Sequence, residues 1–140
     1  MIISKNFLEK KILFHKKRVL YLCNKFGGHI SSSFSTAEII IYLYYNKIIS
    51  RIKNSNKFII SKGHGEVIYF SVLCDLKYFN KKKLFEHYRS GDCYLGGHVS
   101  HKINGVEFST GSLGHGLSYS VGLAHADKIN NNDRKIFCLH

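Results

Sequence analysis

The feature that most constrains the fold is a short apolar run that leads through a glycine-rich loop into a second apolar segment. It lies in KFIISKGHGEVIYF, residues 57–70, where residues 57–61 predict a strand and residues 65–77 a helix. Another strand is predicted at residues 135–140, after a helix at about 112–130. Strands that alternate with helices indicate an α/β fold with a mainly parallel sheet flanked by helices.

The loop within this stretch consists of Lys62, Gly63, His64 and Gly65. A strand, a glycine loop and a helix in that order bring backbone N–H groups to one point, where the helix N-terminus favours an anion. Lys62 and His64 add side-chain donors, and the glycines let the backbone come close to a ligand. The alternative interpretation is a tight turn with solvated basic side chains.

Two helices are predicted before this strand. Ser35 and Glu38 form a capping-box pattern in front of an apolar Ile/Tyr run, so one helix is expected at residues 36–48. The other is expected at residues 7–26, because apolar or imidazole side chains recur there at spacings of four and three. Its stripe consists of Leu8, Ile12, His15, Val19, Leu22 and Phe26.

The rest of the chain contains one more helix and a long irregular segment. Asn80 is expected to cap an exposed helix that runs through KKKLFEHYR. Residues 91–111 show no period and predict a functional loop. At 140 residues, without an internal repeat or linker, the chain is expected to form one domain.

The composition is basic. Lys and Arg outnumber Asp and Glu by 21 to 9, a net charge of +12 that favours acidic partners such as phosphates, nucleic acids or anionic lipid. Basic runs at 16–18 and 81–83, together with many tyrosines, allow a nucleic-acid-binding protein as an alternative. Lys16 and Lys17 fall outside the apolar stripe, however, and three of the nine tyrosines belong to the apolar run at 42–45. A solvated basic face is therefore the preferred interpretation.

The cysteines and the N-terminus indicate the compartment. The four cysteines form no CxxC pair, so we interpret them as reduced thiols in a cytoplasmic protein: Cys23, Cys74, Cys93 and Cys138. Charged residues interrupt the N-terminal apolar positions, so no signal peptide is expected. The most apolar run, residues 37–49, is shorter than the roughly 20 residues that span a bilayer. No membrane segment is expected.

The segment TGSLGHGLSYSVGLAHA, residues 110–126, carries glycines in a predicted helix. Each glycine in a helix interior costs about 1 kcal/mol relative to alanine, so a compensating contact is expected. Gly114, Ser118, Gly122 and Ala126 fall four apart on one face, which allows close approach of another backbone or a flat ligand. Tight packing of this face on the sheet is expected as well. GSLGHG does not match the G-x-G-x-x-G of a dinucleotide fold.

Nine histidines raise the question of a metal site, and His98 with His101 gives H-x-x-H. Zinc sites need three or four ligands at recognisable spacing, and the cysteines and carboxylates do not supply the rest, so no metal ligands are assigned. Three histidines are interpreted as surface or satisfied core residues: His15, His87 and His125. His29, His64 and His98 differ, because each follows glycine in a loop.

These Gly-His loops and the motifs around them resemble a known family. GGHISSSFSTAEII (27–40), SKGHG (61–65), GGHVSHKINGVEFSTGSLGHGL (96–117) and KIFCLH (135–140) together resemble the N-terminal, diphosphate-binding domain of transketolase. The resemblance is strongest to the separate N-terminal subunit of two-chain transketolase-like enzymes. It covers the chain from about residue 10 to its end.

The resemblance implies an enzyme that transfers a two-carbon ketol unit between sugar phosphates, with thiamine diphosphate and a divalent cation such as Mg²⁺. By similarity, His64 would contact the diphosphate of the cofactor. His29 and His98 would reach the reacting centre and the hydroxyls of the donor sugar. Gly111 and Leu113 would offer main-chain contacts to the aminopyrimidine ring. Imidazoles suit these tasks because they donate hydrogen bonds and carry protons near neutral pH.

The sequence departs from the family pattern at two places. His115 stands where many relatives carry glutamine. Relatives also continue the final strand into Gly-Asp-Gly, whose aspartate holds the metal with a later asparagine, whereas this sequence stops at His140. The resemblance therefore implies a partial domain that is inactive alone, whether as a truncated gene product, a pseudogene fragment or part of a split enzyme. A transketolase C-terminal subunit or domain, in a homo- or hetero-oligomer, would complete it. A non-catalytic interaction subunit is the remaining alternative.

Overall fold

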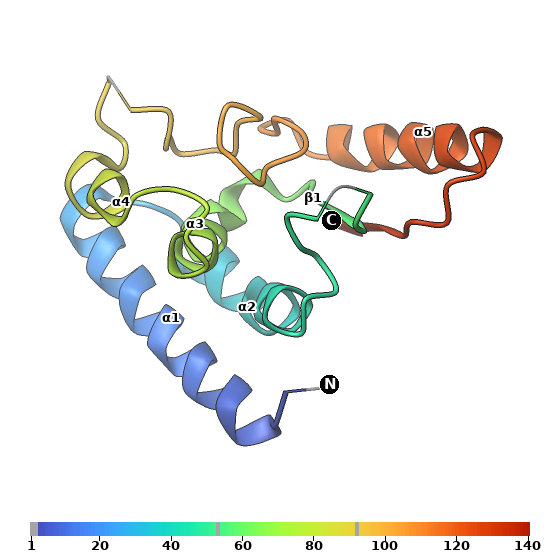
Figure 1. Ribbon diagram of the computed structural model, residues 1–140. Coiled ribbons are helices and arrows are strands. Elements are labelled where there is room, and N and C mark those ends of the chain that lie inside the picture. The colour runs from blue at the N-terminus through green and yellow to red at the C-terminus, as the bar shows by residue number, and fades with distance from the viewer. Residues whose placement is uncertain (1–2, 53, 92) are drawn as a thin grey trace.

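The protein is described by a computed structural model that covers residues 3–52, 54–91 and 93–140 (Figure 1). Asp92, within the predicted loop, and the first two residues of the N-terminal segment lie outside this description. In chain order the elements are α1 (Lys5–Phe26), α2 (Ile30–Tyr45), β1 (Lys57–Ile60), the 3₁₀ turn η1 (Gly63–Gly65), α3 (Glu66–Asp75), α4 (Lys81–His87), α5 (His115–Ile129) and β2 (Ile136–Leu139).

The two strands pair in parallel. Lys57 lies opposite Ile136 and Ile60 opposite Leu139, and the backbone bonds continue beyond the strand where Ser61 N–H donates to the Leu139 carbonyl at 2.8 Å. Parallel strands need a long crossover, which the segment containing α3, α4 and α5 supplies. The predicted α/β class with a parallel sheet flanked by helices is confirmed.

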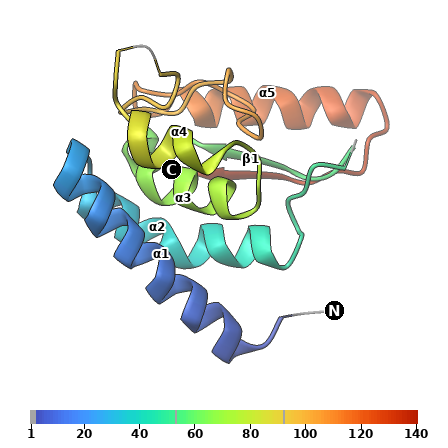
Figure 2. The ribbon, with the colours of Figure 1, turned by 60° about the vertical axis from the view of Figure 1, so that its left-hand side comes forward.

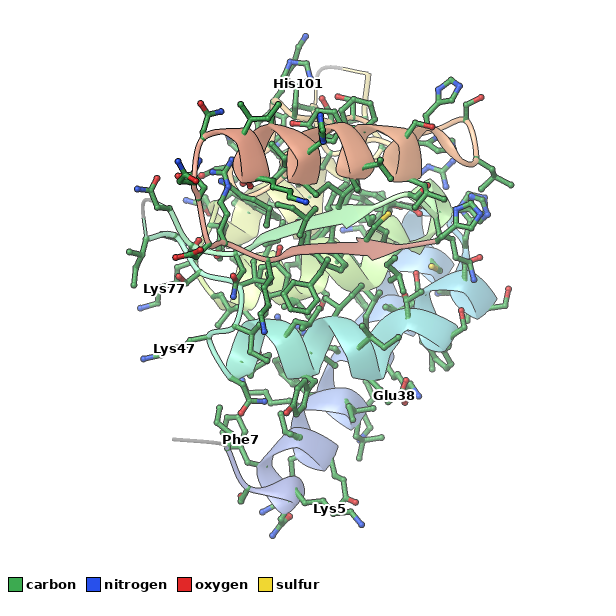
Figure 3. All side chains as sticks on the ribbon, turned by 90° about the vertical axis from the view of Figure 1, so that its right-hand side faces the viewer. Lys5, Phe7, Glu38, Lys47, Lys77 and His101 are labelled. Carbon is green, nitrogen blue, oxygen red and sulfur yellow. The ribbon has the colours of Figure 1, made fainter. Side chains whose placement is uncertain are left out.

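Helices cover both faces of the strand pair (Figures 2 and 3). On one face the ring of Phe58 lies 5.8 Å from that of Tyr44 in α2 and 5.4 Å from that of Tyr69 in α3. On the other face α5 packs on Ile59 through Gly116. Side chains alternate across a strand, so the apolar run of β1 is buried on both sides, as parallel strands require.

The core forms mainly where α1, α2 and α3 meet. Every residue of α3 from Glu66 to Cys74 is buried, whereas α1 buries only a stripe of its surface. That stripe includes His15, whose Nδ1 lies 2.7 Å from the Ser71 hydroxyl and whose Nε2 lies 2.9 Å from the Tyr45 hydroxyl. Of the two interpretations that the sequence left open for these histidines, His15 is therefore a satisfied core residue, while His87 and His125 are exposed.

The predicted start of α2 is wrong. The helix begins at Ile30, six residues before the expected first residue, so Ser35 and Glu38 lie inside it rather than at its cap. The Ser35 hydroxyl donates to the Ser32 carbonyl one turn back, and Glu38 pairs with Lys16 at 2.7 Å. Tertiary packing overrides the capping pattern, since Ser33 and Thr36 are buried.

Other boundaries agree more closely with the sequence. The Asn80 side chain accepts a hydrogen bond from the Lys82 N–H, which confirms the predicted cap of α4. The helix expected from residue 112 begins at His115, after Gly114 with φ 90°. Tyr44 and Tyr45 are buried as expected, but Tyr42 in the same run is 44% exposed.

The small-residue stripe of α5 does not pack on the sheet. A Cβ built on Gly116 would lie 2.7 Å from the Ser61 Cα atom, whereas one built on Gly114 or Gly122 would meet nothing within 4 Å. Ser118 and Ala126 are exposed. The expected tight helix-to-sheet contact therefore exists, but Gly116 makes it, because the neighbouring face of α5 points away from β1.

Two findings concern the cysteines and the membrane. Cys23, Cys74, Cys93 and Cys138 form no disulfide. In the described ranges, none of the helices combines the length and the apolar character needed to cross a bilayer.

Candidate functional site

The candidate site lies at the carboxyl end of β1, where the strand turns into η1 and α3. Lys47 and Lys77, labelled in Figure 3, lie at the opposite end of the strands. Ser61 and Lys62 both donate backbone hydrogen bonds to the Leu139 carbonyl, at 2.8 and 3.1 Å, so the turn stays attached to the sheet. Gly65 N–H then bonds to the Lys62 carbonyl at 2.9 Å, which places His64 at the apex of the turn.

The second segment of the site is the loop between α1 and α2. Gly28 has φ 145°, and a Cβ there would lie 3.0 Å from the Cys23 sulfur and 3.1 Å from a methyl group of Val67. Only glycine adopts this conformation in so little space. The loop therefore runs close against α3 and presents His29 at the N-cap of α2.

The third segment is the loop that carries His98 and Thr110. The Thr110 N–H donates to the Val99 carbonyl at 3.1 Å, and its hydroxyl donates to the Ile60 carbonyl at 2.9 Å. A Cβ built on Gly63 would lie 3.2 Å from both His98 Cδ2 and Thr110 Oγ1. The lack of a side chain at Gly63 thus allows this loop to sit directly on the turn after β1.

Together the three segments bring three imidazoles to one place. The His29 ring centroid lies 5.5 Å from that of His64 and 6.4 Å from that of His98. The His29 side chain is 46% exposed, and none of the three rings is fully buried. The imidazoles can therefore donate or accept hydrogen bonds toward a shared ligand.

Two more predicted site residues lie just before α5. A Cβ on Gly111 would lie 3.7 Å from His98 Cδ2, so Gly111 borders the imidazole cluster. Leu113 is 64% exposed, so most of its side chain faces solvent rather than the histidines. His115, the first residue of α5, is also exposed.

The sequence of the whole chain is similar to that of a known family. Residues 18–136 match the family described as transketolase, thiamine diphosphate binding domain. This match covers most of the chain.

The chain belongs to the transketolase family.

Individual relatives agree with this assignment. A protein of Actinobacillus succinogenes that is named as a subunit of apulose-4-phosphate transketolase is 37% identical, in a match that covers 98% of this chain and 52% of that protein. The protein of the same name from Phocaeicola vulgatus is 31% identical over 89% of this chain and 46% of that protein. Transketolase of Mus musculus is 29% identical over 81% of this chain and 19% of that protein. The chain thus spans about half the length of the two apulose-4-phosphate transketolase subunits.

Within this transketolase domain the structure adds an acid that the sequence analysis missed. Glu66 opens α3 with a side chain that is 0% exposed. Its Oε1 atom accepts a hydrogen bond from the Tyr88 hydroxyl at 3.0 Å and lies 3.4 Å from His29 Nδ1. Its Oε2 atom is buried without a partner. A single carboxylate before the apolar run VIYFSVLC was the available signal, but it also suits the first turn of any helix.

Tyr88 and Arg89 complete the surroundings of Glu66. Burial, followed by the negative charge of Glu66, raises the pKa of Tyr88, so this hydroxyl stays protonated and donates. A Cβ on Gly97 would lie 3.1 Å from the Arg89 Nη2 atom, and one on Gly27 would lie 3.7 Å from Nη1. The guanidinium of Arg89 therefore lies against both GGH loops, next to Gly27 and Gly97.

The same region lacks a metal ligand set. Among residues 3–52, 54–91 and 93–140, no group of three or more His, Cys, Asp or Glu side chains is arranged to hold a metal ion. His101, the partner of His98 in H-x-x-H, instead places Nδ1 2.8 Å from the Ser109 hydroxyl.

Proposed function

We propose that this chain is the N-terminal portion of a transketolase-like enzyme that transfers a two-carbon ketol unit between sugar phosphates with thiamine diphosphate. The observation that carries the proposal is the cluster of three imidazoles from separate loops at the carboxyl end of β1. Open α/β sheets bind ligands at the carboxyl ends of their strands. The family match supplies the cofactor, and the imidazoles suit the chemistry.

The residues around the turn fit a diphosphate. Gly63 and Gly65 lack side chains beside Thr110 and Thr36, so the loop of His98 and helix α2 pack closely against the turn. The backbone N–H groups at the start of α3 favour an anion there. His64 stands at the apex of the turn and is assigned to the diphosphate. Lys62, whose Nζ donates to the Ser35 hydroxyl at 3.0 Å, adds a cation next to it.

The remaining assignments follow the resemblance. His29 and His98 would contact the donor hydroxyls and the reacting centre, since both rings are partly open and lie near His64. Imidazoles there stabilise developing alkoxides by hydrogen bonding and hold protons at their ring nitrogens. Gly111 and Leu113 would offer main-chain groups to the aminopyrimidine. The cofactor itself, when bound, supplies the carbanion chemistry of ketol transfer.

We also propose a divalent cation such as Mg²⁺ as a second cofactor, by membership of the family. The described residues do not provide a ligand set for it, so no step is assigned to the cation. The expectation that the 140 residues are inactive by themselves stays a prediction.

The partner and the substrate come from the relatives. Two of them are named as subunits of apulose-4-phosphate transketolase, and we propose that residues 1–140 form a partial domain that likewise works with a partner subunit. Apulose-4-phosphate is then the first sugar phosphate to assay. The net charge of +12 favours phosphorylated sugars over neutral ones. We also propose a cytoplasmic location, which the four unpaired cysteines support.

Saturation-transfer NMR on the 140-residue chain with thiamine diphosphate and Mg²⁺ tests the cofactor assignment. We expect binding weaker than micromolar that is lost in His64→Ala and kept in His125→Ala, whose exposed imidazole lies on α5. Equal binding by both variants, or none by the parent chain, would contradict the assignment. Micromolar binding by isothermal titration would contradict only the expectation of inactivity.

A further inference from the structure

Glu66 has no assigned role, yet it is the most unusual side chain beside the imidazole cluster. Burial of a carboxylate is costly unless hydrogen bonds satisfy it. Only one oxygen of Glu66 is satisfied, because Oε2 is buried without a partner. An acid that served only to stabilise the start of α3 could do so from a solvated position, without this cost. The carboxylate is therefore better explained by what it contacts.

Its two contacts through Oε1 differ in kind. Tyr88 is 0% exposed and is packed by Phe26 and Phe70, with ring centroids at 5.9 and 6.2 Å, so its hydroxyl has a fixed direction. His29, by contrast, is 46% exposed and borders His64 and His98. Glu66 thus connects a rigid core residue to an open imidazole.

The chemistry of a carboxylate decides which nitrogen of His29 carries hydrogen. An ionised carboxylate only accepts hydrogen bonds, so His29 Nδ1, 3.4 Å from Glu66 Oε1, must donate. In a neutral imidazole the hydrogen on Nδ1 leaves a lone pair on Nε2. We propose that Glu66 is a positioning residue that holds His29 in this tautomer, with Nε2 ready to accept a hydrogen bond from a ligand hydroxyl.

The backbone around His29 supports a fixed ring position. A Cβ on Gly28 would lie 3.4 Å from the Tyr88 hydroxyl, so the same tyrosine that contacts Glu66 also limits the approach of the loop. Carboxylate–imidazole pairs in which the acid orients the ring and selects its tautomer recur in unrelated sites. The meaning of the pair for ketol transfer rests on the proposed function, but the tautomer itself does not.

The test is ¹⁵N NMR of the 140-residue chain labelled at histidine, without cofactor or sugar, with the His29 signal assigned from His29→Gln. We expect hydrogen on Nδ1 in the parent chain. In Glu66→Gln the amide can donate to Nδ1, so the ratio of the two tautomers should move toward Nε2–H by about tenfold or more. The matched control is Tyr88→Phe, which removes a donor to Glu66 but leaves the acid beside His29 and should retain Nδ1–H.

Two results would overturn the proposal: hydrogen on Nε2 of His29 in the parent chain, or an unchanged tautomer ratio in Glu66→Gln. The first does not use Glu66→Gln, so it decides the matter even if that variant does not fold. Loss of thiamine diphosphate binding with the expected tautomer would instead contradict the proposed function alone.

Discussion

The hydroxyl of Thr110 donates a hydrogen bond to the carbonyl oxygen of Ile60 at 2.9 Å, although 50 residues separate them in the chain. Ile60 is the last residue of β1, and Thr110 closes the loop that carries His98. This bond therefore fixes one histidine loop to the strand end from which His64 follows.

Thr110→Val should loosen this loop. The substitution keeps the shape but leaves the buried Ile60 carbonyl without this donor, which costs about 1–3 kcal/mol. We expect a lower free energy of unfolding in urea and faster hydrogen exchange of the residue 110 N–H, which bonds to Val99. Thr110→Ser retains the hydroxyl and is the control. Equal exchange rates in the two variants would show that the hydroxyl does not hold the loop.

Gly116→Ala should destabilise the packing of α5 on β1. The added Cβ would lie 2.7 Å from the Ser61 Cα atom and 2.8 Å from its Cβ, so the helix must shift, at a cost of about 1–3 kcal/mol. Gly122→Ala is the matched control, because its Cβ would meet nothing within 4 Å. That variant should instead gain up to about 1 kcal/mol from helix propensity. Urea unfolding of both measures the contrast, and a stabilised Gly116→Ala would contradict the contact.

Gly28→Ala should disturb the loop that presents His29. Gly28 combines φ 145° with Cβ contacts near 3 Å to Cys23 and Val67, so we expect a loss of about 1–3 kcal/mol. Gly96→Ala lies in the other GGH loop, where a Cβ would meet nothing within 4 Å. It should leave the free energy of unfolding within about 0.5 kcal/mol of the parent. Similar unfolding midpoints for the two variants would show that the Gly28 loop can relax.

His15 should make the stability of the protein depend on pH. Burial, opposed by the charge of Asp75, lowers the pKa of His15 to about 3. Its pKa in the unfolded chain is about 6.5, so the unfolded state binds the extra proton between these values. The free energy of unfolding therefore falls as the pH drops from about 6.5, and the loss between pH 7 and 5 is about 2 kcal/mol.

Urea unfolding at pH 7 and pH 5 measures this loss. His15→Gln should reduce it, whereas His125→Gln, at an exposed position, should not change it. Burial raises the pKa of Asp75, but hydrogen bonds from Lys11 and Tyr45 outweigh this and lower it. That acid therefore acts at lower pH and does not account for a loss above pH 5. Identical pH dependence in parent and His15→Gln would refute the assignment.

Much of the fold could be predicted from residue spacing. The apolar stripe of α1 and the short apolar run of β1 are visible in the sequence, and both elements lie close to the expected residues. The start of α2 could not be predicted, because its first turns contain serines that favour a cap when taken alone. The burial of Ser33 and Thr36 in the folded protein favours the longer helix.

The three loops of the candidate site could be predicted because each contains a glycine followed by a histidine. Three Gly-His pairs identified the loops of His29, His64 and His98, and the structure brings their rings together. Glu66 and Arg89 escaped notice because an isolated charge gives no sign of burial or of a distant partner. The direction of the small-residue face of α5 was also not determined, since Gly116, outside that stripe, meets the sheet, whereas a Cβ on Gly114 or Gly122 would meet nothing within 4 Å.

The register of β1 with β2 has a consequence for biosynthesis. Lys57 emerges from the ribosome 79 residues before its partner Ile136. Strand β1 therefore has no β2 to pair with while α3, α4 and α5 are synthesised. The helices α1, α2 and α3 can associate in that interval because all three are complete by Asp75, well before Ile136 is made. The nascent chain therefore exposes the unpaired edge of the apolar strand β1 until residues 136–139 have been synthesised. Unpaired strand edges promote aggregation, and chaperones that bind them prevent it.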